Sequence, residues 1–195
     1  MKLAKLYNRI GKENKSILLL LEHLARDQKN IDFDVVNITC ELMVAHSKHK
    51  ECCILVEGLL SSSSSSSSSS DKNPMEFLIE IFSKENFKKT KRKNPSEKLI
   101  LEMKEELPVD IIIKYARALM CIGEKEIAKS FMLSMEELDM DEYLDIFLDL
   151  VEVYSEFGLY TDALRVCKKL IDSEEVDDKS LLVLKMGILY GKIGN

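Results

Sequence analysis

The stretch Ala116-x-x-Leu119-x-x-x-Gly123-x-x-x-x-Ala128 returns later in the chain as Val151-x-x-Tyr154-x-x-x-Gly158-x-x-x-x-Ala163. The turn glycines of the two copies are 35 residues apart. A shortened copy and two weaker copies in the N-terminal part are Gly187-x-x-Tyr190-x-x-x-Gly194, Ala4-x-x-Tyr7-x-x-x-Gly11-x-x-x-x-Ser16 and Cys40-x-x-Met43-x-x-x-Ser47-x-x-x-x-Cys52. A constant period of this length indicates an array of short repeated units.

The residue types within the repeat predict a helix–turn–helix unit. Small residues at the ends of the pattern let two helices cross closely, and the aromatic or aliphatic residue fills the space beside them. We expect Gly123, Gly158 and Gly194 each to end a first helix in the left-handed conformation, which glycine adopts without steric cost. The pattern resembles the tetratricopeptide repeat, and this resemblance implies an all-α fold, an α–α superhelix or solenoid.

The chain is expected to have three parts. Residues 1–60 hold two degenerate tetratricopeptide-like units, and residues 108–195 hold two and a half units. Between them, residues 61–107 contain a run of ten serines (Ser61 to Ser70), a basic loop and short helices over 75–82 and 96–106. Since serine buries no apolar surface, the serine-rich insertion is expected to be disordered.

Composition excludes several classes of protein. Of the 195 residues, 46% are hydrophobic and 32% are charged, which is too apolar for a wholly disordered chain. No apolar run approaches the length of a membrane span, and the N-terminus lacks the apolar segment of a signal peptide. Five cysteines without a recurring spacing indicate free thiols in a reducing compartment.

No motif for catalysis, a cofactor or a metal is found. A Gly-rich phosphate loop, a serine nucleophile elbow and an HExxH motif are all missing from the sequence, so a non-catalytic protein without a cofactor is predicted. Cys40, His46, His49 and Cys52 lack the paired spacing of a zinc motif. Cys40 and Cys52 also occupy packing positions of a repeat, so no metal site is predicted.

First helices of tetratricopeptide units line a concave groove, and this resemblance assigns partner-binding positions. The mapped residues are Asp110, Ile113, Arg117, Asp145, Leu148, Glu152, Glu156, Leu184 and Lys192. From Ser134 to Ser180 the chain has fifteen acidic residues and four basic ones. An apolar floor with acidic edges suits a basic, apolar partner segment. The carboxylates equally fit an ordinary solvated helix face, and both interpretations stay open.

A basic stretch precedes the C-terminal units. It comprises Lys88, Lys89, Lys91, Arg92 and Lys93. Such a cluster can contact phosphates or serve as a nuclear localisation signal, although a solvated loop is the favoured interpretation. Since the acidic C-terminal half would repel phosphates, DNA contact is expected to be indirect or confined to this loop.

The C-terminal segment is too apolar for the polar capping helix with which solenoids end. Leu181 to Leu184 are followed by Ile188, Leu189 and Ile193. We therefore expect either a fragment of a longer array or an end that docks on a partner.

Two segments resemble a particular family more closely than a generic repeat. They are Ile31-Asp32-Phe33-Asp34-Val35-Val36-Asn37-Ile38-Thr39-Cys40-Glu41-Leu42 and Leu107-Pro108-Val109-Asp110-Ile111-Ile112-Ile113-Lys114. With the insertion between units, they resemble the tetratricopeptide subunit of general transcription factor III C, which serves RNA polymerase III. The resemblance implies a nuclear scaffold that helps recruit initiation factor III B through protein contacts. Met43 and Ser47 depart from the repeat pattern, so no groove residues are transferred to the N-terminal units.

Two other classes remain open. A generic tetratricopeptide adaptor in a cell-cycle or chaperone-linked complex shares every feature above. An enzyme with a helical-repeat accessory region would need a catalytic domain elsewhere. The proteins that co-purify with the chain separate these possibilities.

Overall fold

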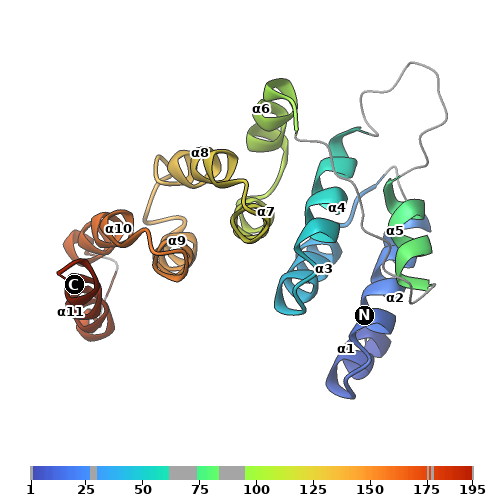
Figure 1. Ribbon diagram of the computed structural model, residues 1–195, viewed down its shortest axis with the longest axis horizontal. Coiled ribbons are helices and arrows are strands. Elements are labelled where there is room, and N and C mark those ends of the chain that lie inside the picture. Colours follow the sequence, from blue (N-terminus) through green and yellow to red (C-terminus); the bar gives the residue numbers. More distant parts are fainter. Residues whose placement is uncertain are drawn as a thin grey trace. The chain divides into compact units, whose positions relative to one another are not determined.

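The computed structural model describes residues 2–26, 30–61, 74–83, 95–174, 176 and 178–194. All regular structure in these residues is α-helical, which confirms the all-α class. Most of the serine run and the whole basic stretch, including Lys88, Lys89, Lys91, Arg92 and Lys93, lie outside the described residues. The helices (Figure 1) are α1 (Lys2–Arg9), α2 (Glu13–Arg26), α3 (Phe33–Ala45), α4 (His49–Ser61), α5 (Pro74–Ser83), α6 (Glu97–Glu106), α7 (Val109–Ile122), α8 (Lys125–Met135), α9 (Leu144–Glu156), α10 (Tyr160–Asp172) and α11 (Ser180–Ile193). In the described part of the chain, no helix combines the length and apolarity needed to cross a membrane.

The chain divides into two compact units, Met1–Glu124 and Lys125–Asn195. The first unit holds α1 to α7, and the second holds α8 to α11. The division falls between the two helices of the third expected repeat. The short helices expected between residues 61 and 107 are present as α5 and α6, and both belong to the first unit.

Four helix-ending turns share one backbone geometry. Gly11, Gly123 and Gly158 have φ values of 69°, 93° and 75°, and Ser47 has φ 58° at the equivalent position. In every case the next backbone N–H donates to the carbonyl five residues before it, on Tyr7, Met43, Leu119 or Tyr154, at 2.7–2.9 Å. This hydrogen bond is the one that closes a Schellman helix end. The expected left-handed turn is therefore confirmed at Gly123 and Gly158.

The prediction for Gly194 is wrong. This residue does end α11, and its N–H donates to the carbonyl of Tyr190 at 3.0 Å. Its φ of −78°, however, is right-handed. The chain there continues the helical conformation instead of reversing.

The small residues of the repeat lie mostly in helix contacts. Those that are buried are Ala4, Ser16, Cys40, Cys52, Ala116, Ala128, Val151 and Ala163. In the first copy, the Ser16 hydroxyl donates to the Ala4 carbonyl at 2.8 Å and joins α2 to α1. Gly187 is the exception, because it is exposed and nothing lies within 4 Å of the position a Cβ would take.

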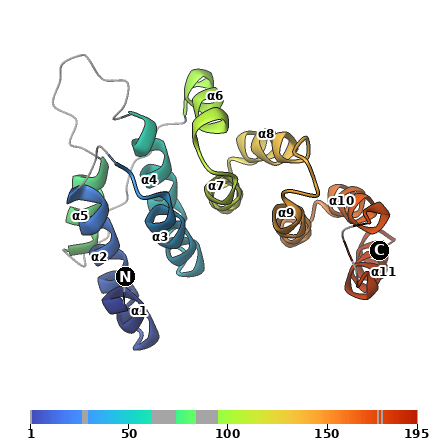
Figure 2. The same cartoon turned by 180° about the vertical axis from the view of Figure 1, so that it is seen from behind.

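In the first unit, consecutive helices from α1 to α4 pack against one another, and α7 packs against both α3 and α4 (Figures 1 and 2). Helix α5 lies against α2 and α4, although most of the serine run separates it from α4 in the sequence. Gly58 permits this approach, because a Cβ there would come within 2.4 Å of the Pro74 side chain. In the second unit, α10 packs against both α9 and α11.

Candidate protein-binding surface

Helix α9 has one acidic, exposed side. Asp145, Glu152 and Glu156 are exposed on it, and Leu148 between them is 39% exposed. The spacing of three, four and four residues keeps these side chains on one face of a helix. The other sides bury apolar residues such as Phe147 at 1% exposure, so α9 is anchored through them and presents the carboxylates outward.

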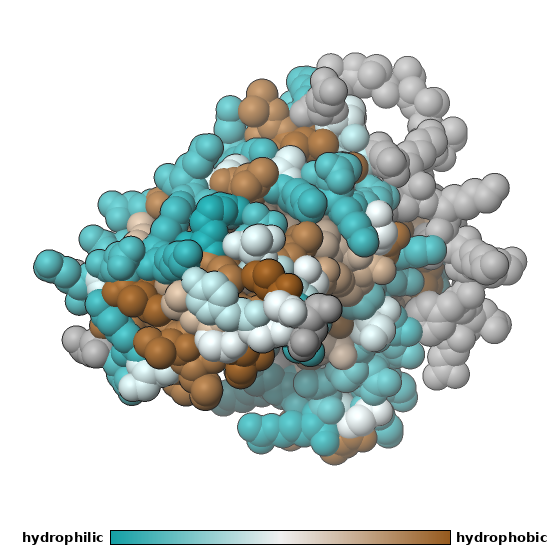
Figure 3. Space-filling view, turned by 60° about the vertical axis from the view of Figure 1, so that its left-hand side comes forward, coloured by the Kyte–Doolittle hydropathy of each residue, from teal (hydrophilic) through white to brown (hydrophobic). Residues whose placement is uncertain are grey.

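Helix α11 is rich in apolar residues, and several of them are exposed to solvent. Leu181, Leu184 and Ile188 are 75%, 62% and 53% exposed, whereas Leu182 and Leu189 are the buried residues of the helix. Figure 3 brings this end of the chain forward and shows brown, apolar side chains gathered there among teal ones. A contiguous exposed apolar surface on a protein commonly marks an interaction site.

An ion pair joins the exposed sides of α9 and α11. The Lys185 ammonium lies 3.0 Å from the Glu152 carboxylate, across 33 residues of sequence. An exposed ion pair of this kind contributes at most about 1 kcal/mol to stability. It does show that the exposed sides of α9 and α11 are neighbours. We call this surface the α9/α11 face, which consists of Asp145, Leu148, Glu152 and Glu156 with Leu181, Leu184, Ile188 and Lys192.

The first turn of α11 is held in place by polar contacts. The Lys179 ammonium donates to the carbonyl of Ile171, near the end of α10, at 2.6 Å. The Asp178 carboxylate accepts the backbone N–H of Ser180 at 2.9 Å. Hydrogen bonds from Ser180 lower the pKa of Asp178 below its ordinary value.

A buried carboxylate organises the rest of the second unit. Glu136, which follows α8, accepts a hydrogen bond from the Tyr154 hydroxyl of α9 at 2.7 Å. Its other oxygen pairs with the Arg165 guanidinium of α10, and its backbone carbonyl accepts from Lys169 at 3.3 Å. Arg165 also donates to Asp162 at 2.6 Å. Glu136 therefore ties the end of α8 to α9 and α10.

The contacts around Glu136 shift the pKa values of two of its partners, Tyr154 and Arg165. Burial, followed by the hydrogen bond to Glu136, raises the pKa of Tyr154 above its ordinary value, so the phenol stays neutral as a donor. The hydrogen bond to Asp162 is the main cause that raises the pKa of Arg165. This cluster is a structural support for α9, because its groups are engaged with one another.

The groove residues assigned to α7 are placed differently. Asp110 is exposed, and Arg117 is half-buried. Ile113 is only 3% exposed, and Ile111 and Ile112 beside it are buried as well. Ile113 is therefore a core residue, not a surface for a partner, since α7 packs against both α3 and α4. All three residues belong to the first unit, whereas the α9/α11 face belongs to the second.

The five cysteines, all within the described residues, are not joined in disulfides, and Cys121 is the exposed one among them. Cys52 and Cys40 are hydrogen-bonded to each other, and this bond together with burial raises the pKa of Cys52 well above its ordinary value. Among the described residues, no group of three or more His, Cys, Asp or Glu side chains is arranged to hold a metal ion.

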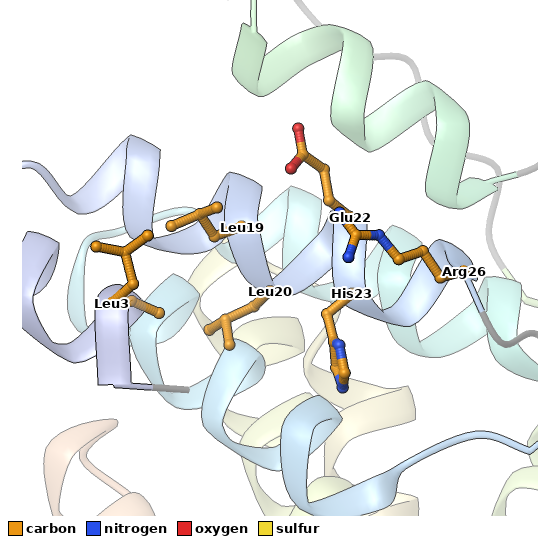
Figure 4. Close-up of a pocket in the computed structure, with 7 residues that line it drawn as sticks. Leu3, Leu19, Leu20, Glu22, His23 and Arg26 are labelled. Atoms are coloured by element: carbon orange, nitrogen blue, oxygen red, sulfur yellow. The ribbon is translucent and has the colours of Figure 1, made fainter.

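Two small hollows flank α1 in the first unit. One, of about 210 Å³, is lined by Leu3 of α1 and by residues of α2 that include Leu19, Leu20 and His23 (Figure 4). The other, of about 290 Å³, lies between α1, α2 and α3 and shares Ala4 and Leu20 with the first. Both are smaller than the roughly 300–1,000 Å³ of typical ligand pockets. They suit single side chains of a partner better than a small molecule.

Two features escaped the sequence reasoning. The Glu136 cluster has no local signature, because its members come from separate helices. An apolar stripe formed by Leu3 and Leu6 of α1 and by Ile10, the first residue after the helix, is exposed by 53–61%. The spacing of three and four residues between these side chains could have predicted that they share one face of a helix.

Comparisons of the chain with protein-family models, with curated proteins and with solved structures found no match.

Proposed function

We propose that this chain is a non-catalytic scaffold, whose α9/α11 face binds a basic, apolar segment of another protein. The observation that carries the proposal is the exposure of Leu181, Leu184 and Ile188, by 53–75%, beside the carboxylates of α9. Covering these side chains would remove apolar surface from water, which is the main driving force of protein association. The carboxylates would favour a basic partner and disfavour an acidic one.

The finer form of the proposal is a tetratricopeptide-like scaffold of transcription factor III C that helps recruit initiation factor III B in the nucleus. Support comes from the repeated left-handed turns at Gly11, Ser47, Gly123 and Gly158 and from the sequence resemblance. A generic tetratricopeptide adaptor in another multiprotein complex is the second candidate, because the same turns and the same face serve it equally.

The test is affinity purification of the tagged chain from its own cells, with initiation factor III B subunits measured by mass spectrometry. The wild-type chain is expected to enrich these subunits. The double variant Glu152→Lys, Glu156→Lys is expected to enrich them at least tenfold less. Glu126→Lys with Glu137→Lys is the matched control, since both residues are exposed in the second unit outside the face. Equal enrichment by all three chains would refute the binding face.

Enrichment of a different set of proteins, lost in the same double variant, would support the generic adaptor instead. Circular dichroism of each variant checks that helicity is unchanged.

A further inference from the structure

The stripe on α1 carries basic side chains around its apolar ones. Leu3, Leu6 and Ile10 are 53%, 55% and 61% exposed. Lys2, Lys5 and Arg9 are exposed beside them, as are Lys12 and Lys15 just beyond the helix end. Glu13 is the single acidic residue between positions 2 and 15. We call Leu3, Leu6 and Ile10 with Lys2, Lys5 and Arg9 the α1 stripe.

Equivalent positions in later repeats lie in helix contacts. The shared turn hydrogen bond aligns Tyr7 with Met43, Leu119 and Tyr154. In that register Leu3 corresponds to Thr39, Tyr115 and Leu150, all at most 1% exposed. Leu6 corresponds to Leu42, Ala118 and Val153, of which the last two are also at most 1% exposed and Leu42 is half-buried. The α1 stripe thus has the character of a helix-packing surface.

The surroundings of the stripe suit a helix with protruding side chains. Leu3 borders the hollow of about 210 Å³ (Figure 4), and Lys5 borders the hollow of about 290 Å³. Hollows of this size can receive aliphatic side chains from a helix laid across α1, as ridges enter grooves in helix packing.

The chain itself carries a surface of matching chemistry. On the α9/α11 face, Leu181, Leu184 and Ile188 have the same residue types and the same spacing as Leu3, Leu6 and Ile10. That face holds three carboxylates, of which Glu152 is already paired with Lys185, and one lysine of its own, Lys192. Asp145 and Glu156 therefore supply the negative charge that opposes the lysines and arginine of the α1 stripe. An apolar centre and complementary charge are both features of specific protein interfaces, and these two surfaces share them.

We propose that the α1 stripe of one copy docks on the α9/α11 face of a second copy. The proposal goes beyond the proposed function, because a second copy and a segment of another protein would compete for the same face. The contact joins two different surfaces, so each added copy leaves one stripe and one face open. Such a head-to-tail contact gives chains of copies, or a ring if the geometry closes.

Sedimentation equilibrium of the 195-residue chain over a wide concentration range tests this contact. The apparent mass is expected to rise with concentration from the monomer mass of 22.3 kDa to at least twice that value. Added salt should reduce the rise, because it screens the charges of the two surfaces. A mass of 22.3 kDa at every concentration would overturn the self-contact. The scaffold proposal is tested separately, by the affinity purification of initiation factor III B.

Two polar variants give the decisive result. Leu6→Ser with Ile10→Ser removes the stripe, and Leu184→Ser with Ile188→Ser removes the face. Each variant alone should sediment as a monomer, because it lacks one of the two surfaces. Their equimolar mixture should form a dimer and nothing larger. The stripe variant supplies the intact face and the face variant supplies the intact stripe, so no surface is left for a third copy. A mixture that stays monomeric would refute the proposal.

The matched control is Leu101→Ser with Leu133→Ser. These leucines are 58% and 50% exposed, and they lie outside both surfaces. The control should associate like the wild-type chain, and loss of association there would show that non-specific apolar contact is responsible. A basic amphipathic helix can also bind an anionic membrane. Wild-type chain that remains monomeric but co-sediments with phosphatidylserine vesicles through Leu6 and Ile10 would overturn the self-contact in favour of lipid.

Discussion

Individual turn residues set where the helices of each unit end. Ser47 occupies a position that is glycine in the four other copies. It keeps the left-handed φ and the hydrogen bond of Gly11, Gly123 and Gly158, with Lys48 donating to Met43 at 2.7 Å. A side chain in this conformation costs roughly 1–2 kcal/mol. The neighbouring helices α3 and α4 must therefore hold Ser47 in a conformation that serine alone disfavours.

Replacing Ser47 with glycine should stabilise the protein. We expect Ser47→Gly to raise the free energy of unfolding by roughly 0.5–1 kcal/mol, after allowing for the greater flexibility of glycine in the unfolded chain. Urea denaturation measures the change. Gly158→Ser is the reciprocal control, since nothing lies within 4 Å of a Cβ there and only the φ of 75° opposes serine. A destabilised Ser47→Gly, or a neutral Gly158→Ser, would contradict this account.

In the second unit, one buried carboxylate ties the end of α8 to α9 and α10. Glu136 is 8% exposed and receives the Tyr154 hydroxyl, while Arg165 offsets its charge. A buried carboxylate is tolerated only when such partners replace its lost hydration. The orientation of α9, and so of its exposed carboxylates, depends on this cluster.

Removal of the Tyr154 hydroxyl should destabilise the second unit. We expect Tyr154→Phe to lower the free energy of unfolding by about 1–2 kcal/mol at pH 7, because Glu136 loses a buried donor. Urea denaturation of Tyr160→Phe, on the half-buried first residue of α10, serves as the control.

The same substitution should change the alkaline limit of stability. The folded state raises the pKa of Tyr154 above its ordinary value of 10.0, so the folded chain holds this proton more tightly than the unfolded chain. That stabilisation is fully present below pH 10 and is lost as the pH rises further. The stability gap between wild type and Tyr154→Phe should therefore narrow above pH 10. A constant gap up to pH 12 would contradict the assigned role of the proton.

At the scale of the molecule, the chain forms two compact units that divide at Glu124. Charge is also unequally distributed, since residues 2–15 are basic and residues 134–180 are strongly acidic. The two candidate surfaces follow this distribution: the basic α1 stripe lies in the first unit, and the acidic α9/α11 face lies in the second.

The two units should respond separately to local substitutions. In hydrogen-exchange mass spectrometry, Tyr154→Phe is expected to accelerate amide exchange in α9 and α10 and leave α2 to α4 unchanged. Ser47→Gly should slow exchange in α3 and α4 and leave α9 and α10 unchanged. Local stability of this kind follows cooperative units of the fold. Equal responses in both units would show that they unfold as one.

The sequence by itself determined the features that depend on neighbouring residues. Helix positions and the left-handed turns at Gly123 and Gly158 follow from local spacing. The acidic side of α9 was equally predictable, because residues three and four apart share a helix face. These properties need no knowledge of which distant helices meet.

Only the tertiary structure decided the features that depend on which distant helices pack against one another. Ile113 is buried because α7 lies against α3 and α4, whereas the tetratricopeptide resemblance had assigned it to a partner-binding groove. Packing also brought α5 back onto α2, left Leu3 and Leu6 uncovered, and placed Lys185 beside Glu152. Burial and pairing across tens of residues are properties of the packed chain, since local sequence sets the faces of a helix but not the neighbours that cover them.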